Sequence, residues 1–199
     1  IVRYADDILI LCSSKKGAEN ALSTAEKILE QQLKLTINRD KTHIAHSDEG
    51  IKFLGVEIGS QYTRIQSKKL KGFKEKLKRM SKRNSGKPLS VIIQALNPIL
   101  RGFSQYFKIA NCGRVLKALA SWLRRRLRSV QLKLWKTPTR LHRRLKQLGY
   151  KPPFKAVSMS KWNTSLSPLA SHAMPNKWFD ELELFNLDTV SVGKVSPVR

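Results

Sequence analysis

The sequence predicts an α+β chain. A sheet-forming segment over residues 1–66 precedes an all-α, strongly basic bundle over residues 67–155 and a neutral extension over residues 156–199. Short apolar runs typical of strands occur in the first segment, and helical spacing of apolar residues fills the second. The charge changes at the same boundaries. The first segment holds nine basic and nine acidic residues, the second holds 26 Lys or Arg against one acid, and the third holds four of each.

The first expected element is a β-hairpin in "IVRYADDILILCSS", with Asp6 and Asp7 at its tip. Successive strand residues face opposite sides, so a straight strand through both aspartates would drive one carboxylate toward the core. A tight turn near residues 5–7 avoids that cost and lets the aliphatic residues of both strands stay buried. A solvated Asp-Asp turn has the same pattern, so the hairpin alone does not identify its chemistry.

The next elements complete a small sheet domain. Residues 13–35 predict an amphipathic helix whose apolar residues share one stripe: Ala18, Ala21, Leu22, Ala25, Ile28 and Leu29. "LTIN" at residues 35–38 predicts a short strand, and the polar loop "RDKTHIAHSDEG" follows it. "IKFLGVEI" predicts one further strand that ends at Gly59.

Two basic helical segments follow from Ser67. The first has an apolar face made of Leu70, Phe73, Leu77 and Met80, and "SKRNSGKP" breaks it. The second consists of "LSVIIQAL" leading into "NPILRGFSQYFKIA". There we expect Asn97 to cap a new helix and Pro98 to take its first position.

A third helix is expected over residues 114–135, with one packing face and one cationic face. The packing face holds Leu116, Leu119, Ala120, Leu123, Leu127, Val130 and Leu134. The cationic face holds Lys117, Arg124, Arg125, Arg126, Arg128, Lys133 and Lys136. Trp122 and Trp135 lie off the apolar stripe, where they either pack against a neighbouring helix or stack on bases, and packing is favoured.

A fourth helix is expected to begin with Thr137 as its cap and Pro138 at its first position. It packs Leu141, Leu145 and Leu148 and ends at Gly149. In the neutral extension, "WFDELELFNL" predicts the one obvious helix.

The charge of residues 67–155 indicates a nucleic-acid partner, because so dense a field of one sign repels itself unless a polyanion is bound. Cys12 and Cys112 suggest neither a disulfide framework nor a zinc site, and fit a reducing compartment. His43 and His46 favour exposed loop histidines over a metal site. No apolar stretch is long enough for a membrane span, and no signal peptide is present, so we expect a soluble chain without membrane contact. The chain starts at Ile1, inside an expected strand, which predicts a piece of a longer protein.

Four ordered blocks resemble the group II intron reverse transcriptase/maturase family. "YADD" at residues 4–7 resembles the metal-binding hairpin of reverse transcriptases, and "INRDKT" at residues 37–42 resembles the block that follows it. "FLG" at residues 53–55 resembles the hairpin that grips the primer end. "LNPILRGFSQYF" together with "WLRRRLRSVQLKLWK" resembles the maturase-specific X domain, which is also the polymerase thumb. The chain departs from the family at Phe103, where Trp is usual.

The resemblance implies a partial reverse-transcriptase palm followed by a basic thumb, and it implies roles for individual residues. Asp6 is then the principal ligand of a two-Mg²⁺ site and Asp7 a more peripheral one, while Tyr4 flanks the primer terminus. Lys41 either approaches the nucleotide phosphates or is an ordinary surface lysine. Phe53, Leu54 and Gly55 form the primer grip. The RNA-binding residues are Lys117, Arg124, Arg125, Arg126, Arg128, Lys133, Lys136, Arg143 and Arg144.

The function that the resemblance implies is RNA-directed DNA synthesis combined with binding of group II intron RNA and assistance to its splicing and mobility. The expected partners are intron RNA, an RNA template, a DNA primer and deoxynucleoside triphosphates, in a bacterial cytoplasm rather than an organelle. We expect this chain alone to be inactive, because the fingers and another metal-binding aspartate are missing. Two alternatives remain: a splicing maturase with a vestigial polymerase, and a basic RNA-binding protein of ribosomal type, which explains the charge but not the hairpin.

Overall fold

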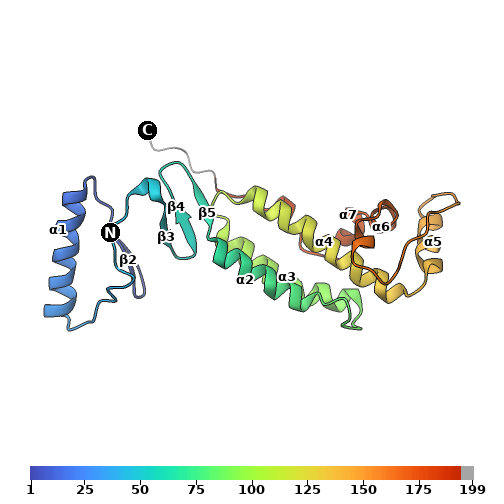
Figure 1. The fold of residues 1–199 in the computed structure, drawn as a ribbon, viewed down its shortest axis with the longest axis horizontal. Helices are drawn as coiled ribbons and strands as arrows, with labels where there is room; N and C mark the ends of the chain where they lie inside the picture. The colour runs from blue at the N-terminus through green and yellow to red at the C-terminus, as the bar shows by residue number, and fades with distance from the viewer. Residues whose placement is uncertain (194–199) are drawn as a thin grey trace. The chain divides into compact units, whose positions relative to one another are not determined.

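The computed structural model describes residues 1–193, which divide into two compact units (Figure 1): unit 1, residues 1–66, and unit 2, residues 67–193. Unit 1 contains the antiparallel pair β1 (Val2–Tyr4) and β2 (Asp7–Leu9), helix α1 (Lys15–Glu26) and a second, three-stranded antiparallel sheet. That sheet is formed by β3 (Ile51–Phe53), β4 (Val56–Ile58) and β5 (Thr63–Ile65). The fold is therefore α+β, with small antiparallel sheets followed by a helical domain.

The β1–β2 hairpin has the turn that the sequence predicts. Tyr4 pairs with Asp7, so Ala5 and Asp6 form the two-residue connection. The expected burial of its aliphatic residues is wrong: Val2 is 49% exposed and Ile8 43%. None of residues 1–54 is buried in the structure. The physical reason is that two short strands and one helix enclose too little volume to cover both faces of a hairpin.

Helix α1 confirms the expected amphipathic helix, with Ser14 capping it by accepting a hydrogen bond from the Gly17 N–H at 3.1 Å. A wider helical turn, η1 (Lys27–Gln32), continues it, and the Leu33 N–H donates to the Ile28 carbonyl at 3.0 Å. The strand expected at residues 35–38 is wrong, since these residues are irregular. Its sequence has strand propensity, but no neighbouring strand pairs with it.

The single strand expected over residues 51–58 is also wrong. Leu54 and Gly55 both have positive φ, 49° and 81°, and reverse the chain between β3 and β4. Two positive-φ residues between paired strands match the right-handed twist of a hairpin. The resemblance of "FLG" to a hairpin therefore described this segment better than its apolar pattern did. Val56 and Ile65 face inward and are 5% and 6% exposed.

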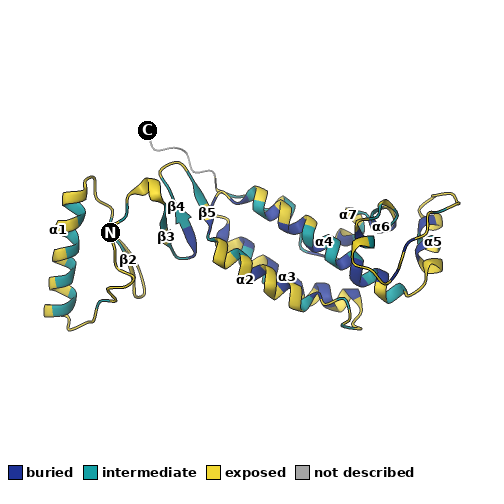
Figure 2. Ribbon diagram, viewed as in Figure 1, coloured by how far each residue is buried: buried dark blue, intermediate teal, exposed yellow. Residues whose placement is uncertain are grey.

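Unit 2 is a helical domain with a continuous aliphatic core. Its long helices are α2 (Ser67–Met80), α3 (Leu89–Phe107), α4 (Gly113–Trp135) and α5 (Pro138–Gln147). Two short helices, α6 (Pro168–Ala173) and α7 (Asn176–Glu181), follow the turn η3 (Asn163–Leu166) and precede η4 (Leu187–Thr189). Figure 2 shows buried residues along these helices, and those at most 1% exposed include Leu77, Ile93, Leu96, Leu100, Leu116, Leu123, Leu127, Leu141 and Leu145.

Helix α3 runs unbroken through Pro98, so the predicted cap at Asn97 and helix start at Pro98 are wrong. The Asn97 side chain instead binds the C-terminal extension. Its Nδ2 donates to the Glu183 carbonyl at 2.7 Å, and its Oδ1 accepts from the Phe185 N–H at 2.8 Å. Pro98 offers no N–H to the carbonyl of Gln94, and this is tolerated because Gln94 is exposed.

The expected packing faces of the other basic helices are largely confirmed. In α2, Phe73 and Leu77 are buried, and Phe73 stacks on Phe103 with ring centroids 3.7 Å apart. In α4 the stripe is buried as far as Val130, whereas the expected Leu134 is only half-buried and Leu132 is buried in its place.

The ends of the chain differ more from expectation. Leu148 is 39% exposed rather than packed, although Gly149 ends α5 with φ 86° as expected. The helix expected at residues 178–187 is confined to α7. The extension packs against α4 through η3, η4 and α6. No helix within residues 1–193 is long and apolar enough to cross a membrane.

Candidate metal hairpin and nucleic-acid interface

The tip of the β1–β2 hairpin presents Asp6 and Asp7 to solvent, with Tyr4 directly opposite Asp7. Ala5 has φ 49°, a left-handed conformation that costs a non-glycine residue about 1 kcal/mol. The Arg3 Nε donates to the Ala5 carbonyl at 3.0 Å across this turn. The turn places the two carboxylates next to each other at the end of the paired strands.

These two carboxylates fit a hard divalent cation as part of a ligand set. Mg²⁺ takes oxygen ligands in near-octahedral geometry, often one or two protein carboxylates with phosphates and waters. Within residues 1–193 no group of three or more potential metal ligands is gathered. The hairpin tip therefore offers two carboxylates, with no third potential ligand gathered beside them within the described residues.

The other residues expected at a polymerase site lie elsewhere in unit 1. Lys41 is exposed in a turn where its N–H donates to the Asn38 carbonyl at 3.2 Å. Phe53, Leu54 and Gly55 lie at the β3–β4 turn, which belongs to a different sheet from the aspartate hairpin. The structure thus brings Tyr4, Asp6 and Asp7 together, and it places Lys41 and residues 53–55 on separate segments.

The cationic face expected on α4 is only partly free, because the C-terminal extension uses two of its arginines. Arg124 forms an ion pair with Asp188 at 2.8 Å, and its side chain is 11% exposed. Arg128 donates from Nε to the Met174 carbonyl at 2.9 Å and from Nη2 to Asn176 Oδ1 at 3.1 Å. Burial lowers the pKa of Arg128, and the neighbouring Arg124 charge lowers it further.

Arg126 is also engaged within the protein. Its Nε donates to Ser81 Oγ at 2.8 Å, which joins α4 to the end of α2. Its guanidinium lies 5.2 Å from the ring centroid of Trp122 and 4.6 Å from that of Trp162. Burial lowers the pKa of Arg126. Arg124, Arg126 and Arg128 are therefore half-buried and engaged within the protein, and Trp122 packs against a side chain of its own helix.

Four of the six remaining expected RNA-binding residues are more accessible. Lys117, Lys133, Lys136 and Arg143 are exposed, while Arg125 and Arg144 are half-buried.

Sequence reasoning missed Arg83, which lies in the loop after α2. Its Nε donates to the Ser129 carbonyl at 3.2 Å, and its two Nη atoms donate to the carbonyls of Met159 and Ser160. No periodic pattern marks a loop arginine, so the sequence held no signal for this role.

Comparison with known proteins assigns both units. Residues 1–58 match the family model described as reverse transcriptase (RNA-dependent DNA polymerase). Residues 70–149 match the group II intron, maturase-specific domain. The two matches are to the two kinds of domain that group II intron reverse transcriptase/maturases combine. Unit 1 thus matches a reverse-transcriptase segment, and unit 2 matches a maturase-specific domain.

Two curated proteins are similar to short parts of the chain. A protein of Saccharomyces cerevisiae named for intron 2 of COX1/OXI3 is 43% identical over 58 residues, which are 29% of this chain and 7% of that protein. Protein YkfC of Escherichia coli (strain K12) is 44% identical over 54 residues, which are 27% of this chain and 14% of that protein. The matched stretches therefore span about a seventh or less of these relatives.

Proposed function

We propose that the chain is part of an RNA-directed DNA polymerase that also binds group II intron RNA and assists its splicing and mobility. The observation that carries the proposal is the adjacency of Asp6 and Asp7 at a hairpin tip, in a chain that also matches the maturase-specific domain. RNA template, DNA primer and deoxynucleoside triphosphates are the proposed substrates, in a bacterial cytoplasm.

The residues of unit 1 would have different roles in such an enzyme. Asp6 and Asp7 would hold Mg²⁺, which when bound supplies charge stabilisation for phosphoryl transfer to a primer 3′-hydroxyl. Tyr4, opposite Asp7, would contact the primer terminus, and residues 53–55 at the β3–β4 turn would position the primer strand. Lys41 is accessible to a nucleotide phosphate.

Unit 2 would bind RNA through its exposed cations. Lys117, Lys133, Lys136 and Arg143 are free to meet phosphates, with Arg125 and Arg144 at the edge of this set. We do not assign Arg124, Arg126 and Arg128 to RNA contacts, because their guanidinium groups already bind protein oxygens or aromatic rings.

A pair of assays on the complete protein tests the proposal: primer extension and intron splicing at matched concentrations. Asp6→Asn should abolish DNA synthesis and leave RNA affinity and splicing assistance intact, because it removes a carboxylate charge in unit 1 and leaves the cations of unit 2 unchanged. Lys117→Gln with Arg143→Gln should lower RNA affinity and splicing together. Splicing lost in Asp6→Asn, with the fold intact by circular dichroism, would overturn the metal-site assignment.

The same assays separate the polymerase from the alternative of a maturase without catalysis. Retained splicing with no primer extension in the unmodified complete protein would favour that alternative. The 199-residue chain alone should not extend a primer, because its hairpin supplies only two metal ligands. Extension by this chain alone would contradict that account of the hairpin.

A further inference from the structure

We propose that a groove at the C-terminal end of α4 holds one unpaired nucleotide of a bound RNA strand. The groove has a volume of about 440 Å³ and lies wholly within unit 2. Lys133, Lys136 and Pro138 form one side, and residues 157–160 form the other. This inference rests on the proposed RNA binding and names the unit of RNA that is recognised.

The groove has an apolar floor and a polar, cationic rim. Val157 and Met159 are 7% and 8% exposed, whereas Lys133 and Lys136 are exposed. No acidic residue lines the groove, and within residues 1–193 neither lysine pairs with a carboxylate. A nucleotide complements these two parts of the groove. Its base offers an apolar face to the floor, and its phosphate carries a negative charge that the lysines of the rim attract.

The size and accessibility of the groove favour a single strand over a double helix. A volume of this order is typical of a site for one small molecule and is far too small for a double helix. The rim residues Ser158 and Ser160 are exposed, so a chain can enter and leave across them. Proteins read RNA mostly where bases are unpaired and can be splayed from a strand.

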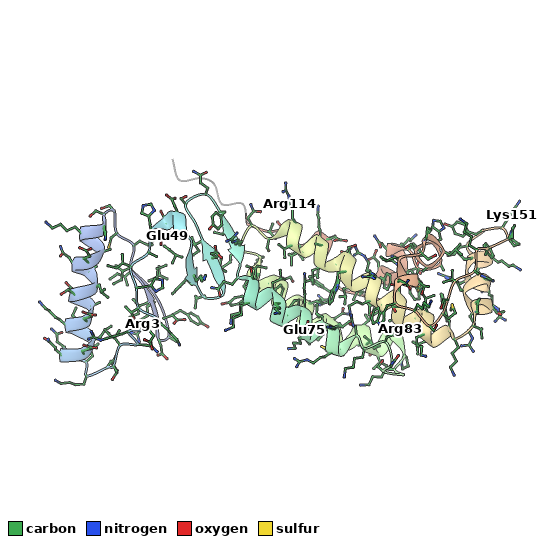
Figure 3. All side chains as sticks on the ribbon, in the orientation of Figure 1. Arg3, Glu49, Glu75, Arg83, Arg114 and Lys151 are labelled. Carbon is green, nitrogen blue, oxygen red and sulfur yellow. The ribbon has the colours of Figure 1, made fainter. Side chains whose placement is uncertain are left out.

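The wall formed by residues 157–160 is fixed before any ligand binds. Arg83 (labelled in Figure 3) donates to the carbonyls of Met159 and Ser160 and to that of Ser129 in α4. It therefore ties this wall to the helix that carries Lys133. A preformed site loses less conformational entropy on binding than one that must be ordered by its ligand.

Lys136 provides an independent indication of a ligand. Its φ is 62°, at the residue that follows α4. Its ψ is −49°, and the Thr137 N–H donates to the Trp135 carbonyl at 2.6 Å, so Lys136 is the central residue of a γ-turn of the rare, strained kind, which glycine adopts more easily because it has no Cβ. Strained non-glycine residues cluster at functional sites, and the one here is a cation on the rim of the groove. Lys136→Gly should therefore relax the backbone while it removes a phosphate contact.

The test measures binding of the 199-residue chain to two labelled RNAs with equal numbers of phosphates. One is a hairpin with a single-stranded uridine tail, and the other is a blunt duplex. The unmodified chain should prefer the tailed RNA. Lys133→Gln/Lys136→Gln should weaken binding of the tailed RNA about tenfold or more and reduce the preference. The slope of log affinity against log salt should become shallower by about 1.4 for the tailed RNA, since each single-strand phosphate contact contributes about 0.7.

The matched control is Lys68→Gln/Lys71→Gln, which removes two exposed charges from α2 outside the groove. It should lower the affinities for both RNAs by similar factors and leave the ratio of the two affinities unchanged. Lys136→Gly should reduce the preference for the tailed RNA without lowering the melting temperature, which separates binding from folding.

The outcomes distinguish the two proposals. If neither RNA binds, the proposed RNA interface is wrong and the groove proposal is overturned with it. If both bind and the Lys133/Lys136 variant keeps the same ratio as the control, RNA binding stands and the groove proposal is overturned. Competition by millimolar uridine monophosphate as strong as that by the tailed RNA would also overturn it, in favour of a free-nucleotide site.

Discussion

Unit 2 and the first 54 residues of unit 1 differ in how much of their own surface they bury. In unit 2, each of α2, α3, α4 and α5 carries leucines that are at most 1% exposed, whereas none of residues 1–54 is buried. Buried apolar area is the main favourable term in folding. The maturase-specific unit therefore carries its own stability. The described residues bury almost no apolar area of the aspartate hairpin and so hardly stabilise it, although the hairpin carries the residues proposed for catalysis.

A second contrast lies within α4, between its arginines and its lysines. Arg124, Arg126 and Arg128 are bonded inside the protein, while Lys117 and Lys133 are exposed. The planar guanidinium offers several donors in a fixed geometry and is weakly hydrated, so it suits buried carbonyls better than an ammonium does. Net charge along this helix thus overstates the charge available to RNA.

The largest expected effect is on backbone hydrogen exchange. Amides in the buried parts of α3 and α4 should be protected by about a thousandfold or more, because they open only with unit 2 as a whole. Amides in β1 and β2 of the 199-residue chain should exchange within about tenfold of an unfolded peptide. Mass spectrometry after short deuterium pulses measures both. Equal protection in the two regions would contradict the contrast in burial.

A pair of substitutions, one in the core of unit 2 and one in the hairpin, should sharpen the same contrast. Leu127 is fully buried, so Leu127→Ala should lower the free energy of unfolding of unit 2 by about 2–5 kcal/mol. Ile8 is 43% exposed, so Ile8→Ala should change stability by no more than about 0.5 kcal/mol. Urea unfolding followed by circular dichroism measures both. A cost for Ile8→Ala comparable to that of Leu127→Ala would show that unit 1 buries its hairpin after all.

The contrast between arginine and lysine can be tested by two substitutions that remove one charge each. Arg128→Gln should destabilise unit 2 by about 2 kcal/mol, because the Met174 carbonyl and Asn176 lose a charged donor. Lys133→Gln should stay within about 0.5 kcal/mol, because Lys133 is exposed. The readout is again urea unfolding. Equal stabilities would mean that the contacts of Arg128 contribute nothing to folding.

The fold was predictable where one helix face meets one core. Spacing alone located α2, α4 and α5 and most of their buried leucines. Spacing did not predict the structure where a residue contacts a segment that is distant in the sequence. Asn97 looked like a helix cap, but its partners Glu183 and Phe185 lie far along the chain. The β3–β4 turn was missed because Leu54 adopts a left-handed conformation that favours glycine.

The candidate site shows the same limit. The placement of Asp6 and Asp7 at a turn followed from local physics, because adjacent carboxylates cannot both avoid the core in a straight strand. The internal contacts of Arg124, Arg126 and Arg128 did not, because helical spacing says which way a side chain points but not what covers it. The covering segment, residues 156–193, carries Asp188 and Met174, and no pattern in α4 indicates them.

The smallest expected effect concerns the one part of unit 1 that does bury residues, the β3–β4–β5 sheet. Arg64 Nη2 lies 2.5 Å from Glu57 Oε1, and this hydrogen bond, more than any other effect, lowers the pKa of Glu57 below its ordinary 4.5. Since the folded pKa is below the unfolded one, Glu57 contributes stability above about pH 4.5, and this contribution is lost as the pH falls through the lowered value. Carbon-detected NMR titration of the Glu57 carboxyl should give a midpoint below 4.5, and Arg64→Gln should raise it. An unchanged midpoint in Arg64→Gln would show that the pair is not formed in solution, and that this sheet is held only by Val56, Ile65 and its backbone hydrogen bonds.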